Sequence, residues 1–96
     1  MPAVTRIGDM DIFHCSLPYR QNGSTDVKAN GRGISRQTDV NTVHLLPGVP
    51  CPAHAAPITS GSSTVRVNKL GAGRIGDSIT SCTAVAQGSP DVFAGP

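Results

Sequence analysis

The sequence has few of the side chains that build a hydrophobic core. Its 96 residues contain no Trp, one Tyr and two Phe. A chain of this length forms one domain and buries little apolar area, so a disulfide framework, a bound metal or oligomerisation usually adds stability. The 11 Gly and 8 Pro predict frequent turns and argue against long helices. We therefore expect residues 1–96 to form a single domain with no extension domain.

The number of cysteines is odd, and the chain lacks a targeting segment. Three Cys fit poorly with a disulfide framework. The N-terminal residues show no basic stretch followed by an apolar one, so the sequence predicts no signal peptide and no membrane span. We expect the protein to start in the cytoplasm, where thiols stay reduced and a Cys near a His indicates metal chemistry.

Charge is sparse, and one acidic residue type is missing. The formal net charge is +2, and the eight basic residues are scattered without forming a run. Phosphate affinity needs clustered Lys and Arg, so we expect no nucleic-acid partner. The chain has no Glu, which excludes a Glu general base, and no Gly-x-Ser-x-Gly precedes a helical pattern. We therefore expect the protein not to be an enzyme.

A short pattern occurs three times along the chain. Each copy reads Arg-x-x-Asp and is followed, five residues after the Asp, by a residue type that binds metals. The copies occupy 6–9, 36–39 and 74–77 and lead to His14, His44 and Cys82. A repeat that varies in its body but keeps a ligand at one position predicts a shared metal centre and approximate three-fold internal symmetry.

A second repeat interlocks with the first, at 23–30, 61–68 and 88–95. Each copy starts with Gly-Ser and continues into a short strand-like stretch. Asn30-Gly31 and Asn68-Lys69 are predicted hairpin turns, because Asn and Gly tolerate positive φ. We expect a mostly β fold in which short hairpins pack about an axis and loops converge at one end.

A closed tetrahedral site needs one ligand beyond the three that the repeat supplies. Segment 51–54 offers two candidates, His54 and Cys51. We favour His54, which brings all three His together with one thiolate, and Cys51 is the alternative. Cys15 follows His14 directly and faces the other way in an extended segment. Four protein ligands of this kind suit a structural Zn²⁺, one per chain, with no position left for water.

The Asp of each repeat has two readings. Asp9, Asp39 and Asp77 either close turns, which we favour, or orient ligand imidazoles from behind. The Arg three residues before each Asp can pair with it, and on a surface such pairs contribute little.

These motifs, in this order, resemble those of PAAR-repeat proteins, the spike-tip proteins of type VI secretion systems and contractile phage tails. The matching segments are 6–9 with His14, 51–54, 61–68, 71–77 with Cys82, and 88–93. The resemblance covers nearly the whole chain. The namesake Pro-Ala-Ala-Arg is replaced by Gly-Ile-Ser-Arg at 33–36 and by Gly-Ala-Gly-Arg at 71–74, where only the Arg is kept.

The resemblance implies a small cone of short β-hairpins with pseudo-three-fold symmetry and a zinc near its tip. The family's three His and one Cys ligands agree with the set His14, His44, His54 and Cys82. The base would cap a trimeric VgrG-type spike, one chain per trimer, with Val27, Val65 and Val92 or their neighbours at the base or in the core. The function implied is envelope piercing and effector attachment: cytoplasmic assembly, delivery on the spike tip and transient contact with a target membrane.

Two functions of other classes remain open from the residues alone. A small zinc-dependent hydrolase would use His14, His44 and His54 with a water on the metal. A nucleic-acid-binding zinc module is the weaker alternative, because no basic cluster is present.

Overall fold

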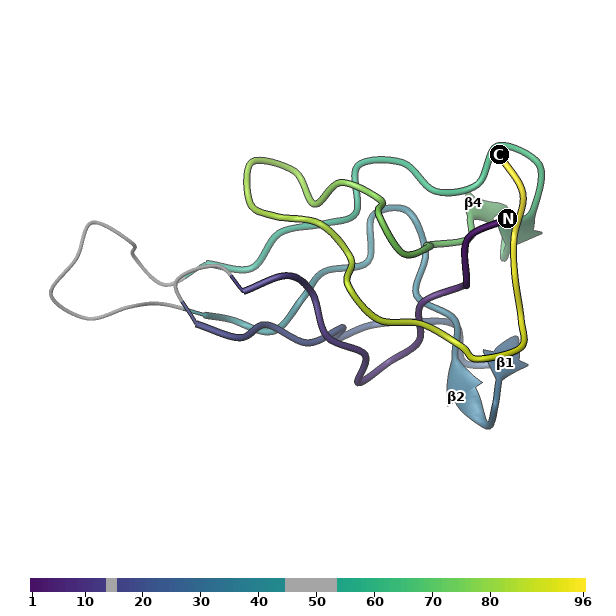
Figure 1. Cartoon of the computed structure of the whole chain (residues 1–96), viewed down its shortest axis with the longest axis horizontal. Helices are drawn as coiled ribbons and strands as arrows, with labels where there is room; N and C mark the ends of the chain where they lie inside the picture. The colour runs from purple at the N-terminus through teal and green to yellow at the C-terminus, as the bar shows by residue number, and fades with distance from the viewer. Residues whose placement is uncertain (14–15, 45–53) are drawn as a thin grey trace, which may run out of the picture.

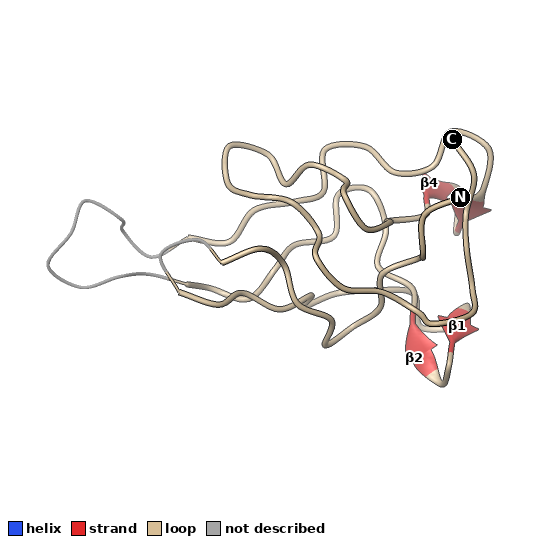
Figure 2. Cartoon of the chain, viewed as in Figure 1, coloured by secondary structure: helices blue, strands red, loops and turns tan. Residues whose placement is uncertain are grey.

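A computed structural model describes residues 1–13, 16–44 and 54–96, with principal-axis extents of 40 × 23 × 20 Å. These residues form strands, bridges and turns, with no helix among them (Figures 1 and 2). Four strands of two residues each are present: β1 (Lys28–Ala29), β2 (Arg32–Gly33), β3 (Arg66–Val67) and β4 (Leu70–Gly71). The mostly β prediction is confirmed. The described part of the chain accordingly offers no helix that could cross a membrane.

Two antiparallel hairpins form at the predicted turns. β1 pairs with β2, and β3 pairs with β4. Asn30 and Gly31 have φ of 54° and 77°, and Asn68 and Lys69 have φ of 53° and 70°. Two successive residues with positive φ define the tight turn whose twist matches that of paired strands, and Asn and Gly adopt it most readily. Lys69 has no such freedom and holds this conformation at a cost.

The third copy of the second repeat closes differently, because the N-terminal segment serves as its partner. Phe93 forms an antiparallel bridge with Ala3. The Val4 amide donates to the Val92 carbonyl at 3.0 Å, in the way that Ala72 donates to Val65 at 3.0 Å. The two chain ends therefore lie at the same end of the molecule as the strands (Figure 1).

The three copies of the first repeat meet in a closed cycle of backbone hydrogen bonds. Thr5 donates to Gly73 at 2.9 Å, Gly73 donates to Ser35 at 2.8 Å, and Ser35 donates to Thr5 at 3.0 Å. Each of these buried residues directly precedes the Arg of its copy. Equivalent positions of the repeat thus contact one another, although three-fold symmetry of the whole body stays a prediction.

Beyond this cycle, extended segments pair in a closed ring. Each segment bridges to the next, and the last bridges to the first, through Met10↔Tyr19, Arg20↔Asn41, Val40↔Pro57, Ile58↔Ile79, Ser78↔Ala84 and Asp11↔Val85. The ring leads to the bridge between His44 and His54. We call this the narrow end, and the end with β1–β4 and both termini the broad end (Figure 1).

Two small apolar clusters fill the interior. One, in the broad half, contains Val4, Ala29, Ile34, Val67, Ala72 and Ala94, with Val92 packed against it. The other contains Ala56, Ile58, Ile79 and Val85, with Cys82 packed against it. Val27 and Val65 remain 38% and 40% exposed. Ala29 and Val67, two residues further along, fill the core instead.

The Asp of each repeat closes its turn and holds the Arg, as the favoured reading predicted. In the first copy, Asp9 Oδ2 accepts from the Arg6 backbone N–H at 2.8 Å and from Arg6 Nε at 2.9 Å. The same bonds recur at 36–39 and 74–77. The pairs are buried to different degrees: the Arg6 and Asp9 side chains are 6% and 0% exposed, whereas Arg36 and Arg74 are 19% and 15% exposed. Since a buried charge needs its partner, each Arg–Asp pair holds its turn in place.

Candidate metal centre

Three candidate ligands from distant parts of the chain meet at the narrow end. His44 and His54 exchange backbone hydrogen bonds of 3.0 and 3.2 Å across their bridge. Cys82 follows a tight turn in which its amide donates to the Ile79 carbonyl at 3.0 Å. One ligand atom from each of the three side chains lies within 4.8 Å of the other two. These three residues could therefore hold a metal ion.

The distances between the ligand atoms fit a tetrahedral centre. Cys82 Sγ lies 3.2 Å from His44 Nε2 and 3.5 Å from His54 Nε2. A tetrahedral zinc with bonds of about 2.3 Å to sulfur and about 2.0–2.1 Å to nitrogen separates such atoms by about 3.5 Å. The side chains are thus already spaced as a metal would hold them.

A hydrogen bond orients the first imidazole for this role. His44 Nδ1 lies 2.8 Å from the Thr42 carbonyl oxygen. Because a carbonyl only accepts, Nδ1 carries the proton and Nε2 faces Cys82 with its lone pair. A metal-binding His commonly uses this arrangement, in which the outer N–H fixes the ring. The His44 and His54 rings are 4.1 Å apart at an interplanar angle of 60°.

The surroundings of Cys82 favour a neutral thiol until a cation arrives. Burial among the apolar side chains of its cluster raises the pKa of the Cys82 thiol. Asn41 Nδ2 lies 4.0 Å from the sulfur, at the limit of a weak hydrogen bond. A bound divalent cation reverses this balance by stabilising the thiolate, so metal binding would release a proton.

The structure places part of the predicted ligand set. His44, His54 and Cys82 come together, and His54 does so without the support of the repeat register. His14, Cys51 and Cys15 lie outside the described residues, so the choice of fourth ligand stays a prediction.

Sequence reasoning missed a buried ion pair in the ring. Arg20 Nη2 donates to Asp11 Oδ2 at 2.7 Å, and both side chains are 0% exposed. Burial raises the pKa of Asp11, while Arg20 works in the opposite direction. In the second copy Asn41 stands where Asp11 does, two residues after the Asp of the repeat, and in the third copy Ile79 does. The charged Asp11 at a position where the third copy has the apolar Ile79 was the sequence signal that could have indicated this buried ion pair.

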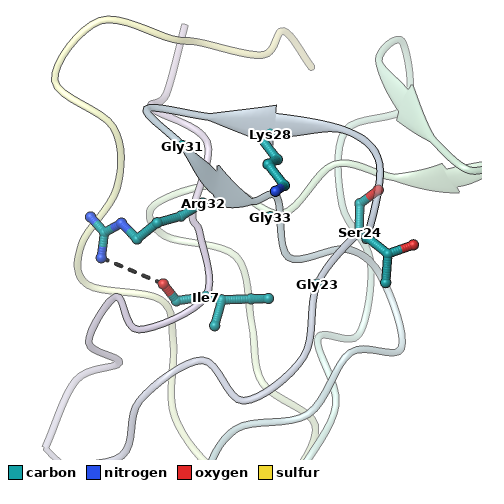
Figure 3. A pocket seen from close by; sticks show the side chains of 8 residues that line it. Ile7, Gly23, Ser24, Lys28, Gly31, Arg32 and Gly33 are labelled. Carbon is teal, nitrogen blue, oxygen red and sulfur yellow. Dashed lines mark hydrogen bonds between the residues drawn. The ribbon is translucent and has the colours of Figure 1, made fainter.

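A pocket of about 420 Å³ lies at the broad end, away from these ligands. Figure 3 shows Lys28 and Arg32 on the β1–β2 hairpin and Ile7 opposite them. Arg32 Nη1 donates to the Ile7 carbonyl at 3.4 Å. None of the three candidate ligands lines this pocket.

Part of the chain matches a known protein family. Residues 49–95 match the family described as PAAR motif. His54 and Cys82 fall inside the matched segment, and His44 precedes it. No curated protein matches the chain. The match confirms the resemblance that the motifs indicated: residues 49–95 of this chain carry a PAAR motif.

Proposed function

We propose that this chain caps and sharpens a trimeric VgrG-type spike of a type VI secretion system or contractile phage tail, with one chain per trimer. The observation that carries the proposal is the closed cycle of Thr5, Ser35 and Gly73. A single chain with three equivalent segments around one line can match a partner with three-fold symmetry, because each segment meets an identical surface. The PAAR motif supports the same reading.

Within this proposal the metal is one structural Zn²⁺. His44, His54 and Cys82 would hold it, with His14 as the fourth ligand and Cys51 as the alternative. A structural zinc supplies cross-links between segments that share little apolar surface. The chain's own part is to present Nε2 of His44 through the Thr42 contact and to pack Cys82 against the apolar cluster.

We propose no catalytic role. A hydrolase needs an open metal position for water, whereas a set of four protein ligands leaves none. The ring that carries the candidate ligands also pairs its neighbouring segments closely, as the His44–His54 bridge shows. Assembly in the cytoplasm, delivery on the spike tip, attachment of an effector and brief contact with a target membrane belong to the same proposal.

The test is the stoichiometry of the complex with a VgrG-type trimer, measured by size-exclusion chromatography with light scattering. We expect one chain per trimer. Val65→Glu, at a position 40% exposed beside β3, should weaken the complex, whereas Val43→Glu, at a position 67% exposed near His44, should leave it unchanged. Three chains per trimer, or no complex with any VgrG-type trimer tried, would contradict the proposal.

A further inference from the structure

The pocket at the broad end lies between the β1–β2 hairpin and the segment that carries Ile7 (Figure 3). Glycine backbone and the Ile7 side chain, which is 38% exposed, form its apolar wall. A Cβ atom at Gly33 would clash with the Ser24 carbonyl oxygen and lie 3.1 Å from Ile7 Cδ1. Gly33 is also the residue paired with Lys28 across the hairpin, so it adds no side chain beside the lysine. These glycines leave a hollow of about 420 Å³.

The backbone places this pocket on the side of the broad end that is nearer the ring. The Ile7 amide donates to the Gly33 carbonyl at 2.9 Å, which fixes the segment beside β2. Directly after it, the Gly8 amide donates to the Arg20 carbonyl at 3.0 Å, where the chain enters the ring. The pocket is therefore bordered by the hairpin on one side and by the start of the ring on the other.

Two cations border the pocket and retain charge for a partner. Lys28 is exposed, and no ion pair among the described residues engages its ammonium group. Arg32 is 43% exposed and lies 3.3 Å from Asp9 Oδ1. Asp9 already accepts three shorter bonds from Arg6, at 2.8, 2.9 and 3.0 Å. Since a guanidinium has five N–H donors, Arg32 keeps most of them for another group.

The wider charge distribution favours an acidic partner. The cations outside the Arg–Asp turns and the ring pair all belong to the two hairpins: Lys28, Arg32, Arg66 and Lys69. The acids outside those pairs are Asp26 and Asp91, which accept from asparagine side chains at 2.9 Å and do not line the pocket. The excess positive charge of the chain therefore lies at the hairpins.

The combination of an apolar wall and two cations is particular to the first copy. Gln37 replaces the isoleucine in the second copy, where its amide donates to the Gly71 carbonyl at 2.8 Å. Leu70 replaces the arginine there, and Phe93 replaces the lysine in the third copy. A contact with a three-fold partner uses three equivalent surfaces. The pocket is therefore suited to a single partner outside such a contact.

We propose that this pocket binds an acidic segment of a partner protein, in which Asp or Glu residues flank a large apolar side chain. The apolar side chain covers Ile7, and the carboxylates pair with Lys28 and Arg32. A guanidinium matches a carboxylate in geometry as well as in charge. A free phosphate would use the charge alone and leave Ile7 uncovered, so the wall favours a peptide. The site goes beyond the spike contact and does not depend on it.

An array of immobilised random peptides tests the proposal with the full chain as the probe. We expect the chain to retain peptides in which acidic residues stand beside a large apolar residue. Their binding should weaken as salt is raised, because exposed charges are screened. Retention without regard to acidic or apolar content, or no retention above background, would overturn the proposal.

Lys28→Glu and Arg66→Glu form a matched pair of variants. Both residues are exposed, occupy the same position of the second repeat and pair with a glycine across their hairpins. Lys28→Glu should weaken binding of the selected peptides by at least about tenfold, because it replaces an attraction with a repulsion. Arg66→Glu should leave binding nearly unchanged. Equal losses would mean that the net charge of the chain, and not this pocket, attracts the peptides, and the proposal would be wrong.

Ile7→Gln and Ile75→Gln test the apolar wall in the same way. The two isoleucines are 38% and 40% exposed, and the second copy already carries Gln37 at this place. Ile7→Gln should weaken peptide binding several-fold, because less apolar area is buried in the contact. Ile75→Gln should bind like the parent chain. Unchanged binding by Ile7→Gln would contradict the proposed apolar contact.

The outcome can be told apart from that of the spike proposal. The peptide measurements use the chain alone, so failure of the spike proposal leaves their result unaffected. A chain bound to a VgrG-type trimer should still bind the selected peptides. If the trimer displaces them, the pocket belongs to the spike contact and the proposal of a separate acidic partner is wrong.

Discussion

The broad and narrow ends of this molecule use the same repeat in opposite ways. At the broad end the three copies keep the same polar contacts. In each copy the serine Oγ accepts a hydrogen bond from the backbone N–H three residues later. The distances are 2.8, 2.9 and 3.0 Å for Ser24, Ser62 and Ser89. At the narrow end the three copies diverge, and one position is filled by a carboxylate, an amide and an aliphatic side chain in Asp11, Asn41 and Ile79.

Contacts between copies at the broad end also follow a cycle. Asn30 Nδ2 donates to Asp91 at 2.9 Å, and Asn68 Nδ2 donates to Asp26 at 2.9 Å. Ser62 Oγ donates to the Gly95 carbonyl at 2.7 Å, which links the remaining pair of copies. Repetition therefore suits the end that we propose meets a three-fold partner. Divergence suits the end where we propose that three copies supply ligands to one metal.

The largest effect should come from removing the metal or a ligand. Cys82→Ser, or a chelator, should destabilise the folded protein by several kcal/mol and by at most about 10 kcal/mol, because metal binding energy in small domains is folding energy. Thermal melts with and without chelator measure this. Thr83→Ser is the control, and it should melt like the parent protein. Equal melting of Cys82→Ser and the parent would show that the narrow end needs no metal.

The next effect concerns the buried ion pair. Arg20→Ala should cost about 3–5 kcal/mol, because it leaves the Asp11 carboxylate buried without a partner. The double variant Asp11→Ile with Arg20→Val introduces apolar side chains like those of Ile79 and Val85, which bridge elsewhere in the ring. It should recover most of that loss, and urea unfolding of single and double variants tests this. A double variant as unstable as Arg20→Ala would mean that apolar side chains cannot replace the ion pair.

A smaller effect is expected from removing the Asp of an Arg–Asp turn, and the loss of unfolding free energy should differ between copies. Asp9→Ala should cost about 3 kcal/mol, since Arg6 is 6% exposed and would keep a buried charge. Asp77→Ala should cost about 1–2 kcal/mol, because Arg74 is 15% exposed and can reach water. Denaturant unfolding of both variants gives the comparison. Equal losses would indicate that turn closure, not burial of charge, sets the stability of these turns.

The smallest effect lies in the two hairpin turns. Lys69 has φ of 70°, whereas Gly31 takes the equivalent place in the other hairpin with φ of 77°. Lys69→Gly should stabilise by about 0.5–1 kcal/mol, because relief of the left-handed conformation exceeds the added chain entropy. The reverse exchange, Gly31→Lys, should destabilise by a similar amount. Melting temperatures that move in the same direction for both variants would contradict this account.

The features of the fold and of the metal centre that could be predicted from the sequence are those set by residues close together in the chain. The turns at Asn30 and Asn68 and the carboxylate that closes each Arg–Asp turn follow from residue chemistry over a few positions. The ligand register placed His44 and Cys82 together because it repeats. Burial of Asp11 and Arg20 depends on ring closure by distant segments, and in the sequence only the comparison of the copies, with Ile79 in the place of Asp11, indicates it.

The strand lengths and the third closure escaped prediction for the same reason. In the strand-like stretch 65–67, only Arg66–Val67 forms a strand, β3. The pairing of Ala3 with Phe93 joins the two ends of the chain. Contacts of such long range leave no periodic signature in a single sequence.

The central claim is that one metal ion is held at the narrow end by side chains of all three copies. Elemental analysis with zinc-edge X-ray absorption on the purified protein tests it most directly. The account predicts one zinc per chain with one sulfur and three nitrogen ligands, the set His14, His44, His54 and Cys82. Two sulfurs would place Cys51 in the site instead of a histidine. A folded protein without metal, or a zinc with an oxygen ligand, would contradict the structural metal centre proposed here.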